Sequence, residues 1–174
     1  RVHVTTHKRG VGWSCGAPRS ILVYRVPPSV VAALASPDVS VRIETVANLA
    51  KSPEKARAIL AAIAIDDSAP LVARIWAMLG IAQVGDEDGG VAVQALVSVL
   101  DASPAVLRRC AIETLGHLKI ESSVAKVAEH LADDEPVPEA WFEDASTPAQ
   151  AARQALTTIG TPAAMAALEG NVAR

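Results

Sequence analysis

One segment of this chain recurs three times with the same internal pattern, and a looser fourth copy follows. The copies read SPDVSVRIETVANLAK from Ser36, SAPLVARIWAMLGIAQVGD from Ser68, SPAVLRRCAIETLGHLK from Ser103 and STPAQAARQALTTIGTP from Ser146. The register is marked by arginines spaced 32 and 34 residues apart, which are Arg42, Arg74 and Arg108. In the fourth copy it falls on Ala152, with Arg153 beside it. Repeats of this length form stacked units, none of which buries its apolar face alone.

Within each copy, apolar residues recur at spacings of three and four, which is typical of an amphipathic helix. Hydrophobic residues make up 51% of the chain but aromatic residues only 3%, so a core of small aliphatic side chains is expected. A short helix over VVAALA, ending near Pro37, precedes the pairs. Helix pairs are predicted over 38–51 with 53–65, 69–84 with 89–101, 104–118 with 122–133, and 147–159 with 162–169. Ser or Thr precedes Pro at several predicted helix starts. The hydroxyl is expected to cap the helix by accepting from an otherwise unpaired backbone N–H, and proline lacks the N–H that the first turn would leave unpaired.

The chain divides into a repeat domain over 27–170, an N-terminal segment over 1–26 and a short tail over 171–174. Residues 1–26 hold five basic and no acidic residues, which leaves 16 − 5 = 11 basic and 19 acidic residues in the rest. The N-terminal segment lacks helical periodicity and is expected to be flexible. Its run ILVYRV also suits a short strand or an extended strip on the first helices.

The repeated segments resemble the HEAT-like repeats, especially the short bacterial kind found in phycobilin lyase subunits. The resemblance rests on Val41-Arg42 to Leu49-Ala50, Arg74 to Gly85-Asp86, Arg108 to Leu115-Gly116 and Ala152-Arg153 to Ile159-Gly160. It implies an all-α fold: a right-handed α-solenoid of about four antiparallel helix pairs, related to armadillo-like superhelices. It also implies that the second helices line the concave face and that most members bind proteins. Arg42, Arg74 and Arg108 are expected to be structural, bonding carbonyls or acids of neighbouring units.

An insertion over 133–147 breaks the period with the acidic sequence EHLADDEPVPEAWFED, which begins at Glu129. Long loops in repeat proteins are often functional, and this one carries the adjacent aromatics Trp141 and Phe142. An acidic rim around an apolar anchor would suit a partner with a basic surface. The alternative is that both aromatics pack between units while the acids stay solvated.

Several chemistries fit poorly, and neither a cofactor nor a metal is expected. The acids do not match a calcium loop, and Glu129-His130 reverses the His-Glu order of di-iron hydroxylases with HEAT-like repeats. A base-excision enzyme would need a basic, aromatic groove, and the acidic repeat domain argues against nucleic-acid binding. Cys110 is expected in the core rather than as a nucleophile. Two cysteines, no membrane-spanning run and no long apolar leader favour a cytoplasmic protein.

The function that these patterns favour is a non-catalytic protein-binding module or scaffold. The residues predicted to bind the partner are Arg57, Gln94, Ser98 and Glu129 on the concave face, with Trp141 and Phe142 as anchor. A lyase-like or chaperone subunit that acts on a prosthetic group with a partner subunit is the alternative. A third possibility is self-assembly through the end units, because the last helix around Ala163 to Leu168 is apolar.

Overall fold

The computed structural model describes residues 25–138 and 146–172, and every regular element within these ranges is helical. The α-helices are α1 (Pro28–Leu34), α2 (Val39–Ala50), α3 (Pro53–Ile65), α4 (Leu71–Val84), α5 (Val91–Val99), α6 (Ala105–His117), α7 (Val124–Glu129), α8 (Pro148–Ile159) and α9 (Pro162–Val172). Two short 3₁₀ turns, η1 (Glu121–Ser123) and η2 (His130–Ala132), flank α7. The expected all-α fold is therefore confirmed for the described residues.

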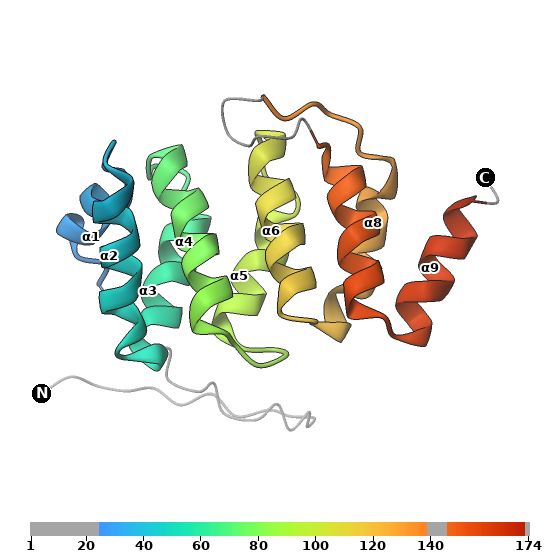
Figure 1. The fold of residues 1–174 in the computed structure, drawn as a ribbon, viewed down its shortest axis with the longest axis horizontal. Coiled ribbons are helices and arrows are strands. Elements are labelled where there is room, and N and C mark those ends of the chain that lie inside the picture. The colour runs from blue at the N-terminus through green and yellow to red at the C-terminus, as the bar shows by residue number, and fades with distance from the viewer. Residues whose placement is uncertain (1–24, 139–145, 173–174) are drawn as a thin grey trace, which may run out of the picture.

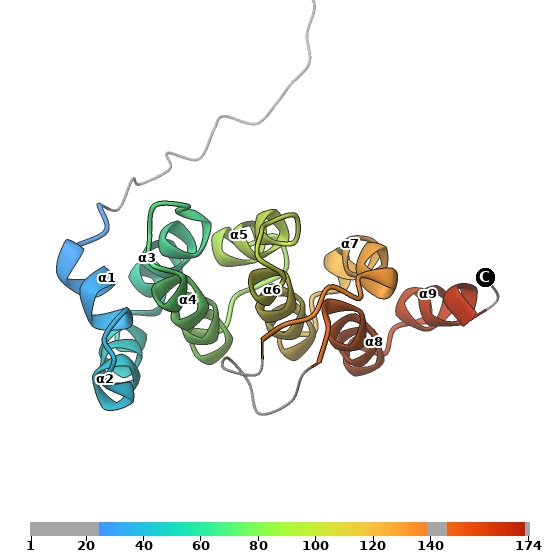
Figure 2. The same ribbon diagram turned by 90° about the horizontal axis from the view of Figure 1, so that it is seen from above.

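The helices stand side by side in a row, with successive helices running in opposite directions (Figure 1). Seen from above, the row has two layers (Figure 2). One layer contains α1, α3, α5 and α7, and the other contains α2, α4, α6 and α8. Helix α9 closes the C-terminal end and contacts both α7 and α8. As a result, every connection lies on one of the two long edges of the row.

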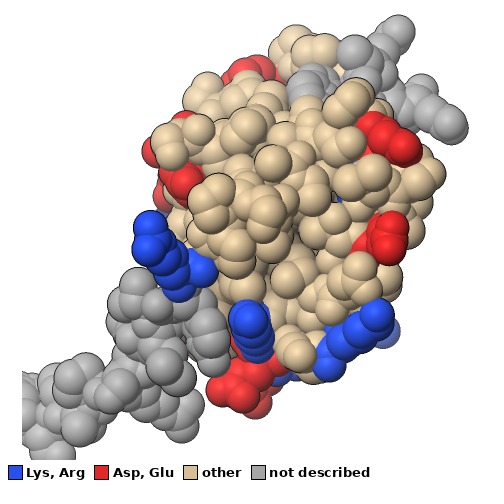
Figure 3. Space-filling view, turned by 90° about the vertical axis from the view of Figure 1, so that its left-hand side faces the viewer, with Lys and Arg blue, Asp and Glu red and all other residues tan. Residues whose placement is uncertain are grey.

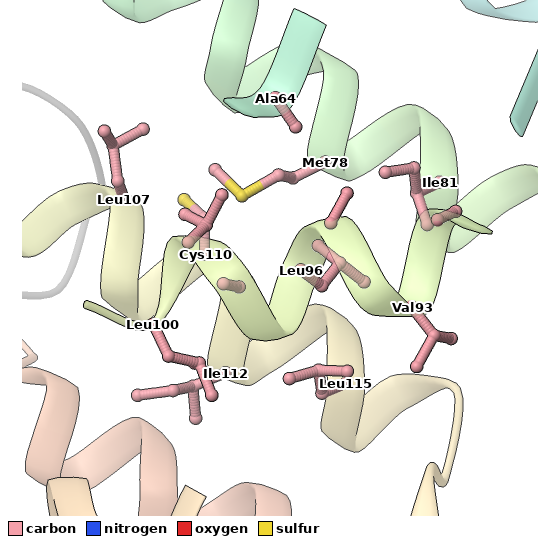
Figure 4. Packing of buried hydrophobic residues seen from close by; sticks show 14 of the residues in the cluster. Ala64, Met78, Ile81, Val93, Leu96, Leu100, Leu107, Cys110, Ile112 and Leu115 are labelled. Carbon is pink, nitrogen blue, oxygen red and sulfur yellow. The ribbon is translucent and has the colours of Figure 1, made fainter. Parts of the chain in front are cut away.

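The core lies between the two layers and consists almost entirely of aliphatic side chains. Met78, Leu96 and Ile112 are fully buried and come from three successive helices that face one another (Figure 4). Cys110 lies among them and is 2% exposed, so it is a core residue. Burial raises the pKa of its thiol to about 12, because the thiolate would lose its solvation. Cys110 is therefore unsuited to act as a nucleophile at neutral pH.

Small residues let neighbouring helices approach closely, both within a layer and between the two layers. A Cβ added to Gly116 of α6 would lie 2.6 Å from the Cβ of Ala155 on α8, a distance that real Cβ atoms do not reach. Gly80 of α4 is also confined, since an added Cβ would lie 3.1 Å from both terminal carbons of Leu60. The alanine and glycine pattern thus sets the spacing of the row.

The helix boundaries agree closely with the predicted ones, except in the third pair. A single helix was expected over 122–133, but α7 covers only Val124–Glu129, between η1 and η2. Side chains from other helices form hydrogen bonds to the residues that follow α7. Arg153, for example, donates to the Leu131 carbonyl at 3.1 Å. The last turn tightens where these contacts replace regular helical bonds.

The expected capping by Ser or Thr before Pro is only partly right. Thr147 forms a full capping box with Gln150 at the start of α8, and the Thr161 hydroxyl accepts from the Ala164 amide. The Ser52 side chain makes no capping bond to α3. Helix α2 begins two residues later than a cap at Ser36 would require, and Asp38 caps it by accepting from the Ser40 amide. The Ser36, Ser52 and Ser103 hydroxyls therefore do not cap the helices that follow them.

The N-terminal end of the row presents an uncharged surface. Figure 3 shows this end, with charged side chains around its margin and uncharged ones at its centre. Helix α2, which lies at this end of the row, has three exposed aliphatic residues: Val39, Val41 and Ile43. In the next unit the position equivalent to Val41 is Ala73, which is fully buried. The first helix pair thus exposes positions that the stack covers elsewhere.

Within the described residues, no helix combines the length and apolar character needed to cross a lipid bilayer. The predictions for 1–24 and for the tail beyond Val172 lie outside the described residues.

Candidate binding edge

One long edge of the row carries the connections from each second helix to the next first helix, at the top of Figure 1. Four successive connections here contain acidic residues and neither lysine nor arginine in their described parts. We call this surface the acidic edge, and define it by Asp38, Asp66, Asp67, Asp101, Asp133, Asp134 and Glu135. The connections on the opposite edge carry both charges. Lys51 follows α2, Asp86, Glu87 and Asp88 follow α4, and Lys119 follows α6. The two edges therefore differ in charge.

The repeat arginines reach the acidic edge from inside the row. Each donates to a backbone carbonyl at, or just after, the C-terminal end of the preceding helix, which belongs to the other layer. The bonds are Arg42 Nη1 to Ser36 O (2.8 Å), Arg74 Nε to Ala64 O (3.0 Å), Arg108 Nη1 to Ala102 O (3.0 Å) and Arg153 Nη2 to Leu131 O (3.1 Å). These carbonyls have no partner within their own helix, so one arginine per unit satisfies a group that would otherwise be left unpaired. These are the contacts expected of structural arginines.

Two of these arginines also form ion pairs with acids of the edge. Arg108 pairs in a bidentate manner with Asp133, with Nε to Oδ2 at 2.7 Å and Nη2 to Oδ1 at 3.0 Å. Its Nη2 also lies 2.8 Å from Glu135 Oε2. Arg74 Nη1 lies 2.9 Å from Asp67 Oδ1, although the Asp67 side chain is 91% exposed. The Arg108–Asp133 pair is largely shielded from solvent and strong, whereas solvent weakens the Arg74–Asp67 pair.

The Arg108–Asp133 pair shifts the pKa of both groups. The hydrogen bonds from Arg108 lower the pKa of Asp133, and a smaller contribution comes from His130, whose Nδ1 lies 3.2 Å from Asp133 Oδ2. The same bonds raise the pKa of Arg108. Both groups therefore stay charged over the whole physiological range.

Arg42 completes its contacts differently from the other repeat arginines. Its guanidinium carbon lies 4.9 Å from the ring centroid of Trp76 on α4, a cation–π arrangement. Its Nε is buried without a hydrogen-bond partner. Trp76 is therefore part of the contact between the first and second units.

A cavity of about 550 Å³ opens on the acidic edge between the C-terminal ends of α3 and α5. Its lining combines carboxylates, hydroxyls and aliphatic groups: Ile65, Asp67, Arg74, Ser98, Val99, Asp101, Ala102 and Ser103. Ile65 is half exposed, at 50%, although it is a large aliphatic residue. Both helix ends point their C-terminal carbonyls this way, which adds negative potential. The cavity thus offers an apolar wall in an acidic setting.

The residues predicted to bind a partner lie in one layer but are not assembled into one site. Arg57 on α3 donates to the Gly85 carbonyl at 2.7 Å and lies 3.5 Å from Asp86, so its guanidinium already has partners. Gln94 bonds the Gly89 carbonyl, and Glu129 pairs with Lys126 at 3.0 Å. Ser98 is the member of this set that lines the cavity. Trp141 and Phe142 lie outside the described residues.

The connection Gly85–Gly90 on the opposite edge is a structural junction. Asp86, whose side chain is 4% exposed, accepts from the Ala92 and Val93 amides at the start of α5. Asp88 accepts from the Ser122 amide at 3.0 Å and from the Ser122 hydroxyl, and these bonds lower the pKa of Asp88. The connection therefore ties the second unit to the third.

Sequence reasoning missed Asp101 and Ile65 as members of a site. The signal was present, because the connection after each second helix in the first three units contains an acid. Within residues 25–138 and 146–172, no three His, Cys, Asp or Glu side chains are grouped so that they would hold a metal ion. A scan against protein-family models found no match, and a comparison with curated proteins found no relative.

Proposed function

We propose that this protein is a non-catalytic protein-binding module that holds a basic, extended segment of its partner along the acidic edge. The observation that supports the proposal is the charge of four successive connections, which contain acids and no lysine or arginine in the described residues. The Asp101 and Asp134 side chains are exposed, and no hydrogen bond or ion pair within the described part engages either carboxylate. Such groups are free to meet the lysines and arginines of a partner.

The fold supports this proposal because the edge is held by contacts inside the row. The arginines behind the edge bond the helix ends and three of the acids, so little ordering entropy is lost when a partner binds. We also infer that the fold is a right-handed α-solenoid of the HEAT-like kind. The support for this is that the repeat arginine makes the same kind of carbonyl bond in every unit. The insertion that carries Trp141 and Phe142 begins on this edge, and we propose both as the apolar anchor.

The test is a titration of the intact chain with a short fluorescent peptide that alternates lysine and serine. We expect saturable binding that weakens with added salt, because exposed charges are screened. The triple variant Asp67→Asn, Asp101→Asn, Asp134→Asn should weaken the affinity by about tenfold or more. A peptide that alternates glutamate and serine should not bind.

The matched control removes the same number of charges from elsewhere: Glu54→Gln, Glu87→Gln, Glu121→Gln. These side chains are exposed, and they lie at the start of α3, in the α4–α5 connection and in η1, which belong to the opposite edge. If both triple variants weaken binding equally, the peptide senses only net charge, and the edge has no special role.

A further inference from the structure

We infer that the cavity between α3 and α5 is a pocket for a single lysine or arginine side chain of the bound segment. This inference rests on the proposed function and names the position on the acidic edge where a partner residue is recognised. Ile65 and Ala102 supply apolar surface, whereas the Asp101 carboxylate supplies charge at the same opening. Basic side chains match this combination, since an aliphatic stem carries a cationic head.

The charge inside the cavity favours a cation. Asp67 and Asp101 carry two negative charges against one positive charge on Arg74. Arg74 is 6% exposed, and its guanidinium is occupied by the Ala64 carbonyl and by Asp67. It is thus a wall of the cavity rather than a group that would bind an anion. The Asp101 carboxylate stays available to a ligand.

The field of Asp101 extends beyond its own connection. After the larger effect of Glu129, Asp101 is one of the charges that raise the pKa of Lys126 on α7. The C-terminal ends of α3 and α5 add their partial negative charge on the other side. A cationic head at the opening would therefore be attracted by the Asp101 carboxylate and the helix ends, against the positive charges of Arg74 and Lys126.

The exposed isoleucine is the feature that separates this cavity from the rest of the edge. Ile65 ends α3, and half of its surface is in contact with solvent. The methylene groups of a lysine or arginine would cover that surface and remove it from water, which favours binding. A flat acidic surface offers no such gain, so the cavity predicts a preference for one position of the peptide.

The experiment uses the same lysine–serine peptide with three variants of the cavity in the intact chain. Asp101→Asn removes the charge, Ile65→Ser removes the apolar wall without changing the charge, and Ser98→Phe fills the space. We expect each to weaken binding by about fivefold to tenfold. Matched controls are Glu54→Gln for the charge and Leu79→Ser for an exposed aliphatic residue, at 42% exposure, on α4. Both controls should stay within about twofold of the original affinity.

A second readout needs no variant. With methyl-labelled isoleucine, the Ile65 signal should shift on addition of the peptide, while that of Ile43, exposed on α2, should not. If Ile65→Ser and Ser98→Phe bind as well as the original and the Ile65 signal stays fixed, the pocket is ruled out. In that case, loss of binding in the triple edge variant would leave the proposed function standing. If the original chain does not bind the peptide, both proposals fail.

Discussion

At the scale of single residues, the account depends on the arginines behind the acidic edge. A sequence motif identifies them, but their contacts differ in strength. Arg108 has a side chain that is 13% exposed and holds a carbonyl and two acids. Arg153 is exposed and donates one hydrogen bond of 3.1 Å. The same position in the repeat therefore contributes unequally to stability.

Replacing Arg108 with alanine should lower the free energy of unfolding by about 3 kcal/mol, because Asp133 is left without its partner. Arg153→Ala should cost about 1 kcal/mol or less, since a single partly exposed bond is lost. Urea unfolding followed by circular dichroism measures both. Equal losses would show that burial of the ion pair does not matter here.

The pKa of Asp133 predicts how stability depends on acid. Hydrogen bonds from Arg108 hold this pKa below its ordinary value of 3.8 in the folded protein. Its contribution is complete above that ordinary value and is lost as the pH falls through the folded pKa. Stability should therefore fall below about pH 4, and Asp133→Asn should flatten the fall. The measurement is the midpoint of thermal unfolding against pH.

The control for the pH measurement is Asp134→Asn, which removes the neighbouring exposed acid. Asp134 has no ion pair within the described residues, so its variant should keep the acid dependence of the original chain. A steep fall in the Asp133 variant, equal to that of the original, would contradict the role given to the Arg108–Asp133 pair.

At the scale of helices, small residues determine how closely α6 and α8 pack. Gly116→Val should destabilise the protein by about 2 kcal/mol or more, because the added Cβ would overlap Ala155. Gly170→Ala is the control, since nothing lies within 4 Å of an added Cβ in α9. It should not lower stability, because alanine favours helix more than glycine does. Chemical denaturation separates the two outcomes.

Asp86 is expected to matter more than its acidic neighbours on the same connection. It satisfies two amides at the start of α5 and faces Arg57. Asp86→Ala should cost about 2 kcal/mol, since loss of a helix cap and of a buried acceptor combine. Glu87→Ala removes an exposed acid and should change stability by about 0.5 kcal/mol at most. Amide exchange in α5 should speed up only in the first variant.

The helices could be predicted from the sequence because local signals agree with the packing. Apolar spacing, proline and glycine located α3 and α4 to within two residues, since every unit repeats the same surroundings. Helix α7 was predicted too long because the residues after its C-terminal end bond Arg108 and Arg153, which lie on other helices. Local pattern carries no information about such contacts.

The site was harder to predict than the fold for a related reason. Arg57 was expected to face a partner, yet it bonds the connection of the next unit, 28 residues along the chain. The acidic edge collects residues from connections that are about one repeat apart, so no single stretch of sequence displays it. Asp101 and Ile65 come together only when α3 and α5 stand side by side.

At the scale of the whole molecule, the protein is a row of helices with one acidic edge and one uncharged end. The end formed by α1 and α2 exposes Val39, Val41 and Ile43, while the edge concentrates charge that the interior arginines only partly neutralise. Binding along the edge would cross several units, so affinity should depend on the distribution of charge rather than on one residue.

The most direct test is an amide shift map of the intact labelled chain during titration with the lysine–serine peptide. The account predicts that the shifting signals belong to 66–70, 100–104 and 133–135, with the connection 85–90 on the opposite edge unchanged. Shifts spread over the surfaces of α3, α5 and α7 instead, with the edge connections unaffected, would contradict it.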